Sequence, residues 1–376
     1  MGWESCLSMV YYAIAFILTL LLCKWQGTPQ VTNRGVRVNT FPQMKAVVVV
    51  LVPFAFLALF RWNVGADSVY GQSYTVAYHA AADGMNKLDF EVGFYWFLRL
   101  FAELGIPFYW FLFAHGIFFF FLISYAIYKG TVWGTWSVLL FFLLTVYFDS
   151  YSSLRQSLAE ALCLVGWALM GSENKSQKKD ISILFLFLLS TMFHSTGWLN
   201  IPIYLLCKLR FRRRVDVLIF AMIAVAMTPV LQKVIPVVMN ALSSNDHYTV
   251  LGLARINIAV TGLFFFIAWL FYDEIDKANE NGYMYVNQAM YIFILILNSG
   301  AMYLPYRVYD MLKIGYIFII PQIIRNISDE KNRFLVQAVL AAVCIATFVN
   351  FITQPGNPYV NYQSAFSDWA NIIRLP

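Results

Sequence analysis

The sequence predicts an all-α integral membrane protein, a polytopic bundle of about 11–12 transmembrane segments with a short interfacial or re-entrant helix on the external side. Of its 376 residues, 60% are hydrophobic and only 12% are charged, and the mean hydropathy is +0.65. Soluble domains carry about 25% charged residues, and one soluble core cannot enclose 34 Phe, 23 Tyr and 11 Trp. The composition therefore excludes a disordered chain and argues against a soluble enzyme.

Apolar stretches of the length that a bilayer requires, about 20 residues per helix, follow one another along the chain. We expect one polytopic membrane domain over residues 1–376. The first stretch is longer than the core of a signal peptide and ends at Lys24, so it is expected to span the membrane. The predicted spans are residues 7–23, 46–60, 107–128, 132–148, 154–170, 181–206, 215–235, 256–272, 287–304, 308–324 and 334–351.

Two segments differ from simple spans. Residues 91–104 are apolar but short and contain three charged residues, so we expect an interfacial or re-entrant helix within an external region over 61–106. Residues 181–206 are long and are interrupted by glycine and proline close to His194. We expect two short helices that meet near His194, because irregular backbone at membrane depth is tolerated only where it lines a cavity.

The basic residues predict the orientation of the chain. The net charge of +6 comes from lysines and arginines in short loops between spans, and such loops remain in the cytoplasm. The amino terminus and the tail after residue 353 then lie outside. The predicted cytoplasmic loops are residues 24–45, 171–180, 208–214 and 325–333, together with Lys129.

Several functional classes lack their motifs. The sequence has no Walker sequence and no GxGxxG that opens a helix, so an ATPase or a dinucleotide enzyme is not supported. The five cysteines have no metal-ligand spacing, and we expect neither a metal nor another cofactor. Because the basic charge belongs to membrane loops, a nucleic-acid partner is not expected.

Three arginines lie at the external ends of predicted spans, where positive charge is normally scarce. They are Arg155, which is followed by Gln156, and Arg255 and Arg307. An ionisable residue in a span costs at least about 2.5–3.5 kcal/mol, and arginine forks bind phosphate oxygens in a bidentate manner. Convergent arginines would suit a diphosphate group. The alternative is that each arginine anchors a helix end or pairs with an acid; the candidate acids are Asp149, Asp246 and Asp310.

Other polar residues predict an acid–base and sugar-binding role. His194 is the most interior ionisable residue, and histidine exchanges protons near neutral pH; the alternative is a structural hydrogen-bonding role. The external acids Asp67 and Glu91 are candidate general bases for transfer to a hydroxyl. The aromatic rings of Tyr70 and Tyr74 would pack against sugars, unless they are simply interfacial aromatics.

The order of these features resembles the EpsG-like family of bacterial membrane proteins, which includes Wzy-type O-antigen and exopolysaccharide polymerases. The resemblance covers roughly residues 67–322. It rests on Asp67 with its spaced tyrosines, the Glu-Val-Gly-Phe-Tyr sequence from Glu91, Leu-Arg-Gln-Ser-Leu-Ala from Leu154, Phe-His-Ser from Phe193, and Tyr-Arg-Val-Tyr from Tyr306.

The resemblance implies polymerisation at the outer face of the bacterial cytoplasmic membrane. A glycan on undecaprenyl diphosphate would be transferred to the sugar of another lipid-linked repeat unit, without a nucleotide. Arg155, Gln156 and Arg307 match family positions, as does His194, and Arg255 and Asp67 match more weakly. The implied partners are the polyprenyl-diphosphate-linked oligosaccharide and the bilayer; a chain-length regulator and other glycan assembly proteins are further candidates.

Alternative functions remain open at this point. A flippase or transporter for the same lipid-linked oligosaccharide would also need a cationic cavity, although transporters often show related halves, and no half-repeat is visible. A polysaccharide ligase or an acyltransferase that acts on lipid-linked glycans would share the external arginines and the histidine. A purely structural scaffold would leave the external arginines unexplained.

Overall fold

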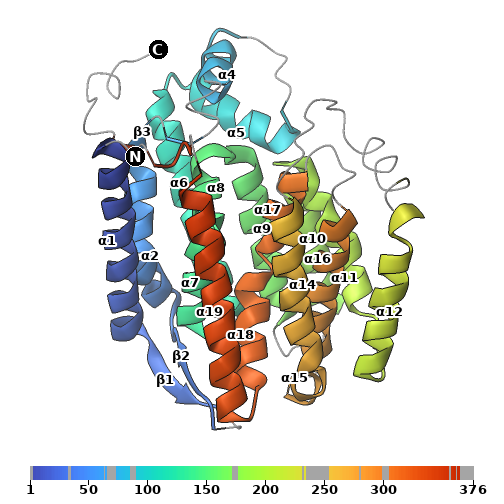
Figure 1. Cartoon of the computed structure of the whole chain (residues 1–376). Helices are drawn as coiled ribbons and strands as arrows, with labels where there is room; N and C mark the ends of the chain where they lie inside the picture. The colour runs from blue at the N-terminus through green and yellow to red at the C-terminus, as the bar shows by residue number, and fades with distance from the viewer. Residues whose placement is uncertain are drawn as a thin grey trace.

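The computed structural model is a bundle of helices that run side by side, with two short helices, α4 and α5, above its upper end (Figure 1). It describes residues 3–32, 35–62, 64–65, 73–84, 90–171, 177–230, 233, 254–278, 281–298, 305–354, 357–360 and 362–364. The predicted all-α membrane bundle is confirmed.

The first half of the chain builds the left and the middle of the bundle and the cap above it (Figure 1). Its elements are α1 (Trp3–Gln26), β1 (Thr28–Val31), β2 (Arg37–Thr40), α2 (Met44–Leu59), β3 (Arg61–Trp62), α4 (Ser73–Ala82), α5 (Val92–Glu103), α6 (Phe108–Gly130), α7 (Gly134–Leu143), α8 (Val146–Ser152) and α9 (Leu154–Met170).

The second half completes the bundle and returns to the first half. Its elements are α10 (Gln177–Thr191), the 3-10 helix η1 (Ser195–Leu199), α11 (Asn200–Cys207), α12 (Arg214–Ala226), α14 (Ala254–Leu270), α15 (Tyr272–Ala278), α16 (Gly282–Asn298), α17 (Pro305–Lys313), α18 (Tyr316–Asn326), α19 (Glu330–Ile352) and β4 (Gln363–Ser364). The last strand pairs antiparallel with β3, which fixes the end of the described chain to the end of α2.

Within the described residues, three helices are long and apolar enough to cross a membrane on their own. They are Leu7–Gln26, Phe108–Gly130 and Glu330–Ile352. The bent pair α7 and α8 forms a fourth candidate, with a kink of 46°, and Met44–Leu59 and Arg255–Leu270 are apolar but shorter. The described residues hold fewer such helices than there are predicted spans, because some predicted spans are interrupted, some form shorter helices such as α9, and some continue beyond the described residues.

The interruptions occur where polar groups lie inside the bundle. Residues 181–206 divide into α10, η1 and α11 around His194, as predicted. The predicted spans 132–148 and 308–324 also divide, into α7 and α8 and into α17 and α18, which was not predicted. The first of these breaks contains Thr145 at φ +64°, a left-handed conformation that is unfavourable for a β-branched residue.

Neither the first hairpin nor helix α4 was predicted from the sequence. The predicted loop 24–45 contains the antiparallel hairpin of β1 and β2, in which Thr28 is opposite Thr40. The external region contains α4, whose buried residues are Tyr74, Ala77, Tyr78 and Ala81. Their spacing of three and four residues is the stripe of an amphipathic helix, so the signal for α4 was present in the sequence.

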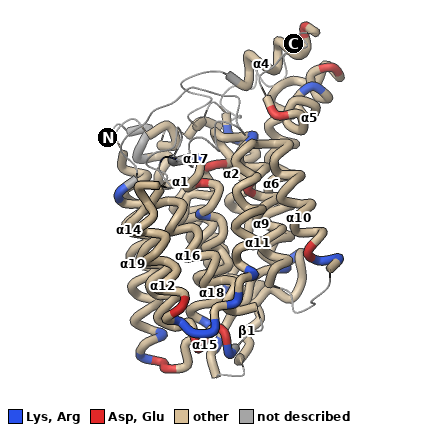
Figure 2. The backbone as a smooth tube through the Cα atoms, turned by 90° about the vertical axis from the view of Figure 1, so that its right-hand side faces the viewer, with Lys and Arg blue, Asp and Glu red and all other residues tan. Residues whose placement is uncertain are grey.

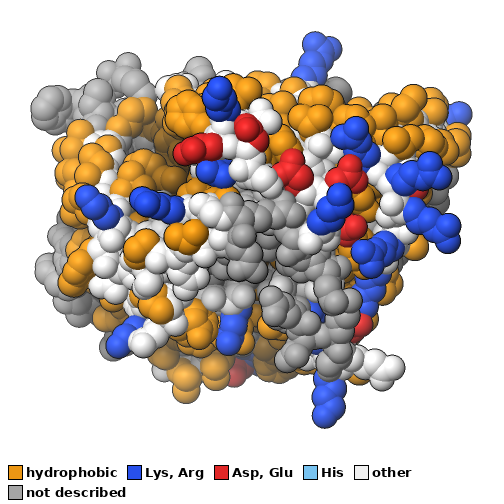
Figure 3. Space-filling view, turned by 90° about the horizontal axis from the view of Figure 1, so that it is seen from below, with side chains coloured by type: hydrophobic (Ala, Val, Ile, Leu, Met, Phe, Trp, Pro, Cys, Tyr) orange, Lys and Arg blue, Asp and Glu red, His pale blue; other side chains and the backbone are white. Residues whose placement is uncertain are grey.

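Charged residues gather at the two ends of the bundle, with few in the body between them (Figure 2). The lower end carries the basic segments that follow α1, α6, α11 and α18, and Figure 3 shows lysines and arginines spread over this face. The first residues of α9 and the end of α10 lie at the opposite end. The predicted basic loops and the predicted arginine site therefore lie on different faces of the molecule.

Candidate active site

Arg155 lies in the first turn of α9, at the upper end of the bundle. The turn is supported from α6, where His115 Nε2 lies 2.9 Å from the Leu154 carbonyl oxygen; because a carbonyl only accepts, this nitrogen is the donor. The preceding residue, Ser153, makes no side-chain cap. A cation at a helix N-terminus opposes the helix dipole, so Arg155 requires a negatively charged neighbour.

Glu91 is that neighbour. Its Oε2 lies 2.7 Å from Arg155 Nη1, and its Oε1 accepts a hydrogen bond from the Ser195 backbone N–H at 3.0 Å. The guanidinium also lies 4.8 Å from the centre of the Phe90 ring and contacts the Tyr74 hydroxyl. Arg155 and Glu91 side chains remain 16% and 19% exposed, so the pair lies at the edge of the site.

The position of Glu91 depends on a close contact between α5 and the end of α10. The backbone N–H groups of Gly93 and Phe94 both donate to the Met192 carbonyl oxygen, at 2.7 and 3.3 Å. A Cβ atom at Gly93 would lie 2.8 Å from that oxygen, closer than such atoms pack. The glycine of the Glu-Val-Gly-Phe-Tyr sequence therefore allows α5 to dock and brings Glu91 to Arg155.

Gly93→Ala should separate α5 from Met192 and weaken the contact between Glu91 and Arg155. We expect shorter glycan chains or at least a tenfold fall in polymer, with α6 and the bundle intact because α5 lies above them. The measurement is polymer length on a gel beside membrane abundance. The matched control is Gly84→Ala, where a Cβ would meet no atom within 4 Å although φ is +81°. Normal polymer in Gly93→Ala would contradict this role.

His194 and Arg307 form the second half of the site. His194 lies in the turn between α10 and η1 and is 4% exposed. Its Nδ1 contacts Thr196, at 2.8 Å from Oγ1 and 3.3 Å from the backbone nitrogen, and its Nε2 lies 3.5 Å from Arg307 Nη1. Burial, reinforced by the positive charges of Arg307 and Arg155, lowers the pKa of His194 well below its usual value. The imidazole is therefore neutral at neutral pH.

Gln156 joins the two halves. Its Nε2 donates to the Arg307 carbonyl oxygen at 3.0 Å and to Glu160 Oε1 at 2.9 Å. Gln156 is only 2% exposed. The Gln156 amide nitrogen thus bonds inside the protein and connects the first turn of α9 to the first turn of α17, whereas diphosphate binding by Gln156 stays a prediction.

Helices α9 and α17 each place an arginine of their first turn at the site. Arg155 is the second residue of α9 and Arg307 the third residue of α17. Helix N-termini attract anions through their N–H groups and dipoles, and each carries an arginine that would otherwise be unfavourable there. The neutral His194 lies 3.5 Å from Arg307, and the charge of Arg155 also acts on it. This combination can bind an anion with two or more oxygens and exchange a proton beside it.

The remaining predicted residues lie apart from this group or cannot be placed. Asp67 and Tyr70 lie outside the described residues. Arg255 is exposed at the start of α14, and in the described part of the chain no contact connects it with Arg155 or Arg307. Tyr74 is 6% exposed, with Phe90 and Phe94 against its ring. A covered ring has no face for a sugar, so Tyr74 supports Arg155 instead.

Sequence reasoning missed a cluster of charged residues below the site. Lys313 at the end of α17 contacts Asp149 Oδ2 at 2.8 Å, Asp310 Oδ1 at 2.7 Å and Thr145 Oγ1 at 2.9 Å. Glu160 lies beside them and is fully buried. Asp149 and Asp310, the candidate partners of the arginines in the sequence, both pair with Lys313. The sequence signal was the presence of Glu160 and Lys313 within apolar segments.

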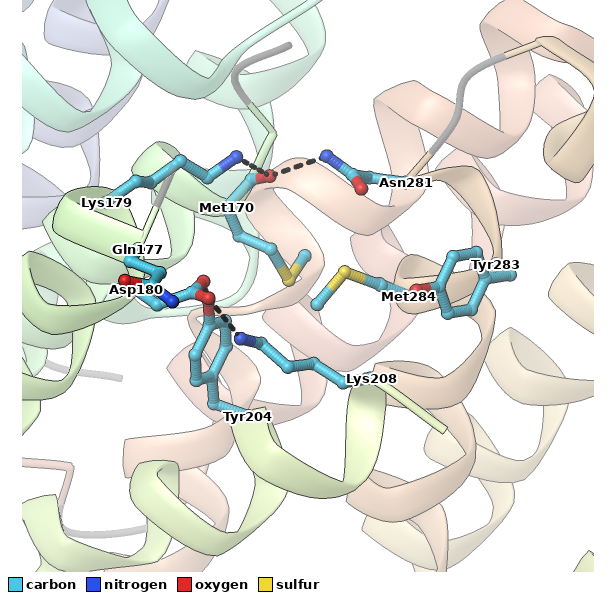
Figure 4. A pocket seen from close by; sticks show the side chains of 9 residues that line it. All are labelled: Met170, Gln177, Lys179, Asp180, Tyr204, Lys208, Asn281, Tyr283 and Met284. Atoms are coloured by element: carbon cyan, nitrogen blue, oxygen red, sulfur yellow. Dashed lines mark hydrogen bonds and ion pairs between the residues drawn. The ribbon is translucent and has the colours of Figure 1, made fainter. Parts of the chain in front are cut away.

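A separate cavity of about 360 Å³ lies at the opposite end of the bundle, where α9 ends and α10 and α16 begin. Figure 4 shows its polar groups paired with one another. Lys179 and Asn281 both donate to the Met170 carbonyl oxygen, at 3.3 and 3.4 Å, and Lys208 lies 2.6 Å from Asp180. These contacts connect helix ends, and none of the predicted site residues is among them.

This cavity supplies a control for substitutions at the candidate site. Asp180→Asn should leave polymer length unchanged, because the Asp180–Lys208 pair is 40% and 37% exposed on its two sides. Pairs exposed to this extent contribute roughly 0–1 kcal/mol. We expect a small decrease in the melting temperature of the purified protein. A loss of polymer as severe as that of site variants would show that charge substitutions disturb the protein unspecifically.

A second hollow, of about 600 Å³, lies between α1, α7 and α19. Its lining is almost wholly apolar and includes Phe16, Leu139 and Ile345. Such a lining suits a hydrocarbon chain rather than a sugar or a phosphate, because it offers apolar contact without hydrogen-bond partners.

Fold and site together define a polytopic helical membrane protein with a cationic site at one end of its bundle. A model of the EpsG family matches residues 44–364, from α2 to β4. The chain belongs to the EpsG family, and the resemblance noted in the sequence is confirmed. This membership indicates a glycan-polymerase-like membrane protein. No curated protein and no solved structure matches the chain.

Proposed function

We propose that this protein is a polysaccharide polymerase. It transfers a glycan from a polyprenyl diphosphate to the sugar of a second lipid-linked repeat unit, at the outer face of the bacterial cytoplasmic membrane. The observation that carries the proposal is the position of Arg155 and Arg307 at two helix N-termini that Gln156 connects, with a neutral His194 beside Arg307. Family membership supports the polymerase class.

The proposed orientation in the membrane rests on the difference in basic residues between the two ends of the bundle. The basic segments after α1, α6, α11 and α18 lie at the lower end, and the positive-inside rule assigns such segments to the cytoplasm. The site at the upper end then faces outward, where the repeat units of O-antigen, capsule or exopolysaccharide would arrive. A lipid-linked substrate reaches this site from the bilayer, so its partners are the lipid substrate and the membrane.

In the proposed reaction, the acceptor hydroxyl oxygen attacks the anomeric carbon of the donor sugar. The bond between that carbon and the phosphate oxygen breaks, and its electron pair leaves with the polyprenyl diphosphate. Arg155 and Arg307 stabilise the charge that develops on this leaving group, since positioned donors act most strongly where charge appears. The hydroxyl proton passes to a base, and no nucleotide takes part.

The contacts narrow the choice of base. Both oxygens of Glu91 already accept bonds, from Arg155 and from the Ser195 N–H, which favours a positioning role for Glu91. His194 Nε2 faces Arg307. In the tautomer whose Nδ1–H donates to Thr196 Oγ1, Nε2 carries no hydrogen, and it becomes available as a base when Arg307 binds phosphate oxygens. We therefore propose His194 as the base, with Asp67 as the alternative.

The direct test uses purified protein with synthetic lipid-linked repeat units and no nucleotide. Formation of longer lipid-linked glycans, with release of free polyprenyl diphosphate, would support the polymerase. Movement of intact repeat units across the membrane of a vesicle without lengthening would indicate the flippase instead. Transfer of the glycan to a different acceptor would indicate a ligase, and transfer of an acyl group would indicate an acyltransferase.

A further inference from the structure

Glu160 is a carboxyl group buried one turn below Gln156 on α9. Its exposure is 0%, and its Oε1 accepts a hydrogen bond from Gln156 Nε2 at 2.9 Å. Its other oxygen, Oε2, receives no hydrogen bond from any described residue. An ionised carboxylate in this position would have a buried oxygen without a donor, which is strongly unfavourable.

The neighbouring ammonium group of Lys313 makes its contacts to groups other than Glu160. Lys313 donates to Asp310 Oδ1 and Thr145 Oγ1, at 2.7 and 2.9 Å, and forms an ion pair with Asp149 Oδ2 at 2.8 Å. The charges also do not balance, because the three carboxyl groups of Glu160, Asp149 and Asp310 have one cation, Lys313, among them. The titratable groups around Glu160 are Asp149 from α8, Asp310 and Lys313 from α17, and Cys163 one turn along α9.

The carboxyls of Glu160 and Asp149 are close enough to influence one another electrostatically, and one oxygen of each, Glu160 Oε2 and Asp149 Oδ2, has no hydrogen-bond partner among the described residues. Two ionised carboxylates both accept and neither donates, and like charges at this distance repel. A single proton removes both problems, because a neutral acid donates from one oxygen and still accepts at the other. Asp149 is the group that stays ionised, since Lys313 pairs with it.

We infer that Glu160 is held as a neutral carboxylic acid that donates its proton to Asp149 and accepts from Gln156. In this form Glu160 orients the Gln156 amide, whose Nε2 also donates to the Arg307 carbonyl oxygen at 3.0 Å. Glu160 is thus a positioning residue for the first turn of α17. Its effect on activity rests on the proposed polymerase function, whereas its protonation state does not.

The protonation state is tested by infrared difference spectroscopy on the full-length protein in lipid nanodiscs. Wild-type protein should show the carbonyl band of a neutral carboxylic acid at pH 7, and that band should be absent from Glu160→Gln. The control variant Asp180→Asn, at the opposite end of the bundle, should keep it. A wild-type spectrum at pH 7 without a band that depends on Glu160 would overturn the inference.

The positioning role is tested by comparing two substitutions. Glutamine reproduces a neutral acid, because its oxygen accepts from Gln156 and its NH₂ group donates to Asp149. Glu160→Gln should therefore keep polymer synthesis within about twofold of wild type, and Glu160→Leu at equal abundance should lower it at least tenfold. Equal damage from both substitutions would overturn the role, because it would mean that a negative charge is needed. If wild-type protein makes no polymer at all, the proposed function fails, and the infrared result still decides the protonation state.

Discussion

Replacing Arg155 by alanine is expected to abolish polymer while the amount of protein in the membrane stays unchanged. Arg155 is one of two arginines at the helix N-termini that face the proposed leaving group, and Glu91 and Phe90 hold its guanidinium in place. Removal of one positioned donor to a developing negative charge typically costs about 100-fold to 1,000-fold in rate. The readout is the ladder of surface glycan lengths, with an immunoblot for abundance.

Two companion variants separate charge from geometry at this position. Arg155→Lys keeps the charge but not the planar fork, and we expect it to recover only a small part of the activity. Glu91→Gln can still accept from Ser195 N–H but no longer balances the arginine, so it should reduce polymer less than Arg155→Ala. Loss of the protein from the membrane in Arg155→Ala would contradict a direct role and would make Arg155 a structural anchor.

Arg307→Ala is expected to lower turnover at least about 100-fold, because it also removes a positioned donor to the leaving group. It should in addition change the protonation of His194. Arg307 lies 3.5 Å from His194, and its positive charge is one of the causes that lower the pKa of this histidine. Without Arg307, the pKa of His194 should rise toward its usual value. The residual activity of Arg307→Ala should therefore fall more at mildly acidic pH than that of the wild-type protein.

The measurement is the pH dependence of turnover on purified lipid-linked repeat units, at saturating and at low substrate. Arg307→Lys keeps a positive charge near His194, so it should keep the wild-type pH profile while losing rate. A pH profile of Arg307→Ala that matches wild type would contradict His194 as the base. Wild-type turnover in Arg307→Ala would contradict the phosphate-binding role.

Much of the bundle could be predicted because membrane helices need long apolar stretches, and these are visible in the sequence. The break at His194 was predictable for the same reason, since glycine and proline interrupt an apolar run there. The break at Thr145 was not, because it contains no helix-breaking residue and depends on Lys313 more than 160 positions later. Helix α4 was overlooked, although its stripe of buried residues was present.

The site was predictable in part. Arg155, Glu91, His194 and Arg307 stood out as polar residues at span ends, and the structure brings them together. Their pairing could not be predicted, because it depends on which helices adjoin in space: the sequence suggested Asp149 and Asp310 as partners for the arginines, whereas both pair with Lys313. The hydrogen bonds of Gln156 to Glu160 and to the Arg307 carbonyl oxygen likewise depend on how α9 and α17 pack.

The most direct test of the polymerase assignment is deletion of the gene in its host, with surface and lipid-linked glycans separated by length on a gel. The assignment predicts a ladder that collapses to single repeat units, and its restoration by the wild-type gene but not by the Arg155→Ala variant. Complete loss of exported glycan would point to a flippase or an earlier step. A normal ladder would contradict the polymerase and would leave decoration of a finished glycan as the remaining enzymatic function.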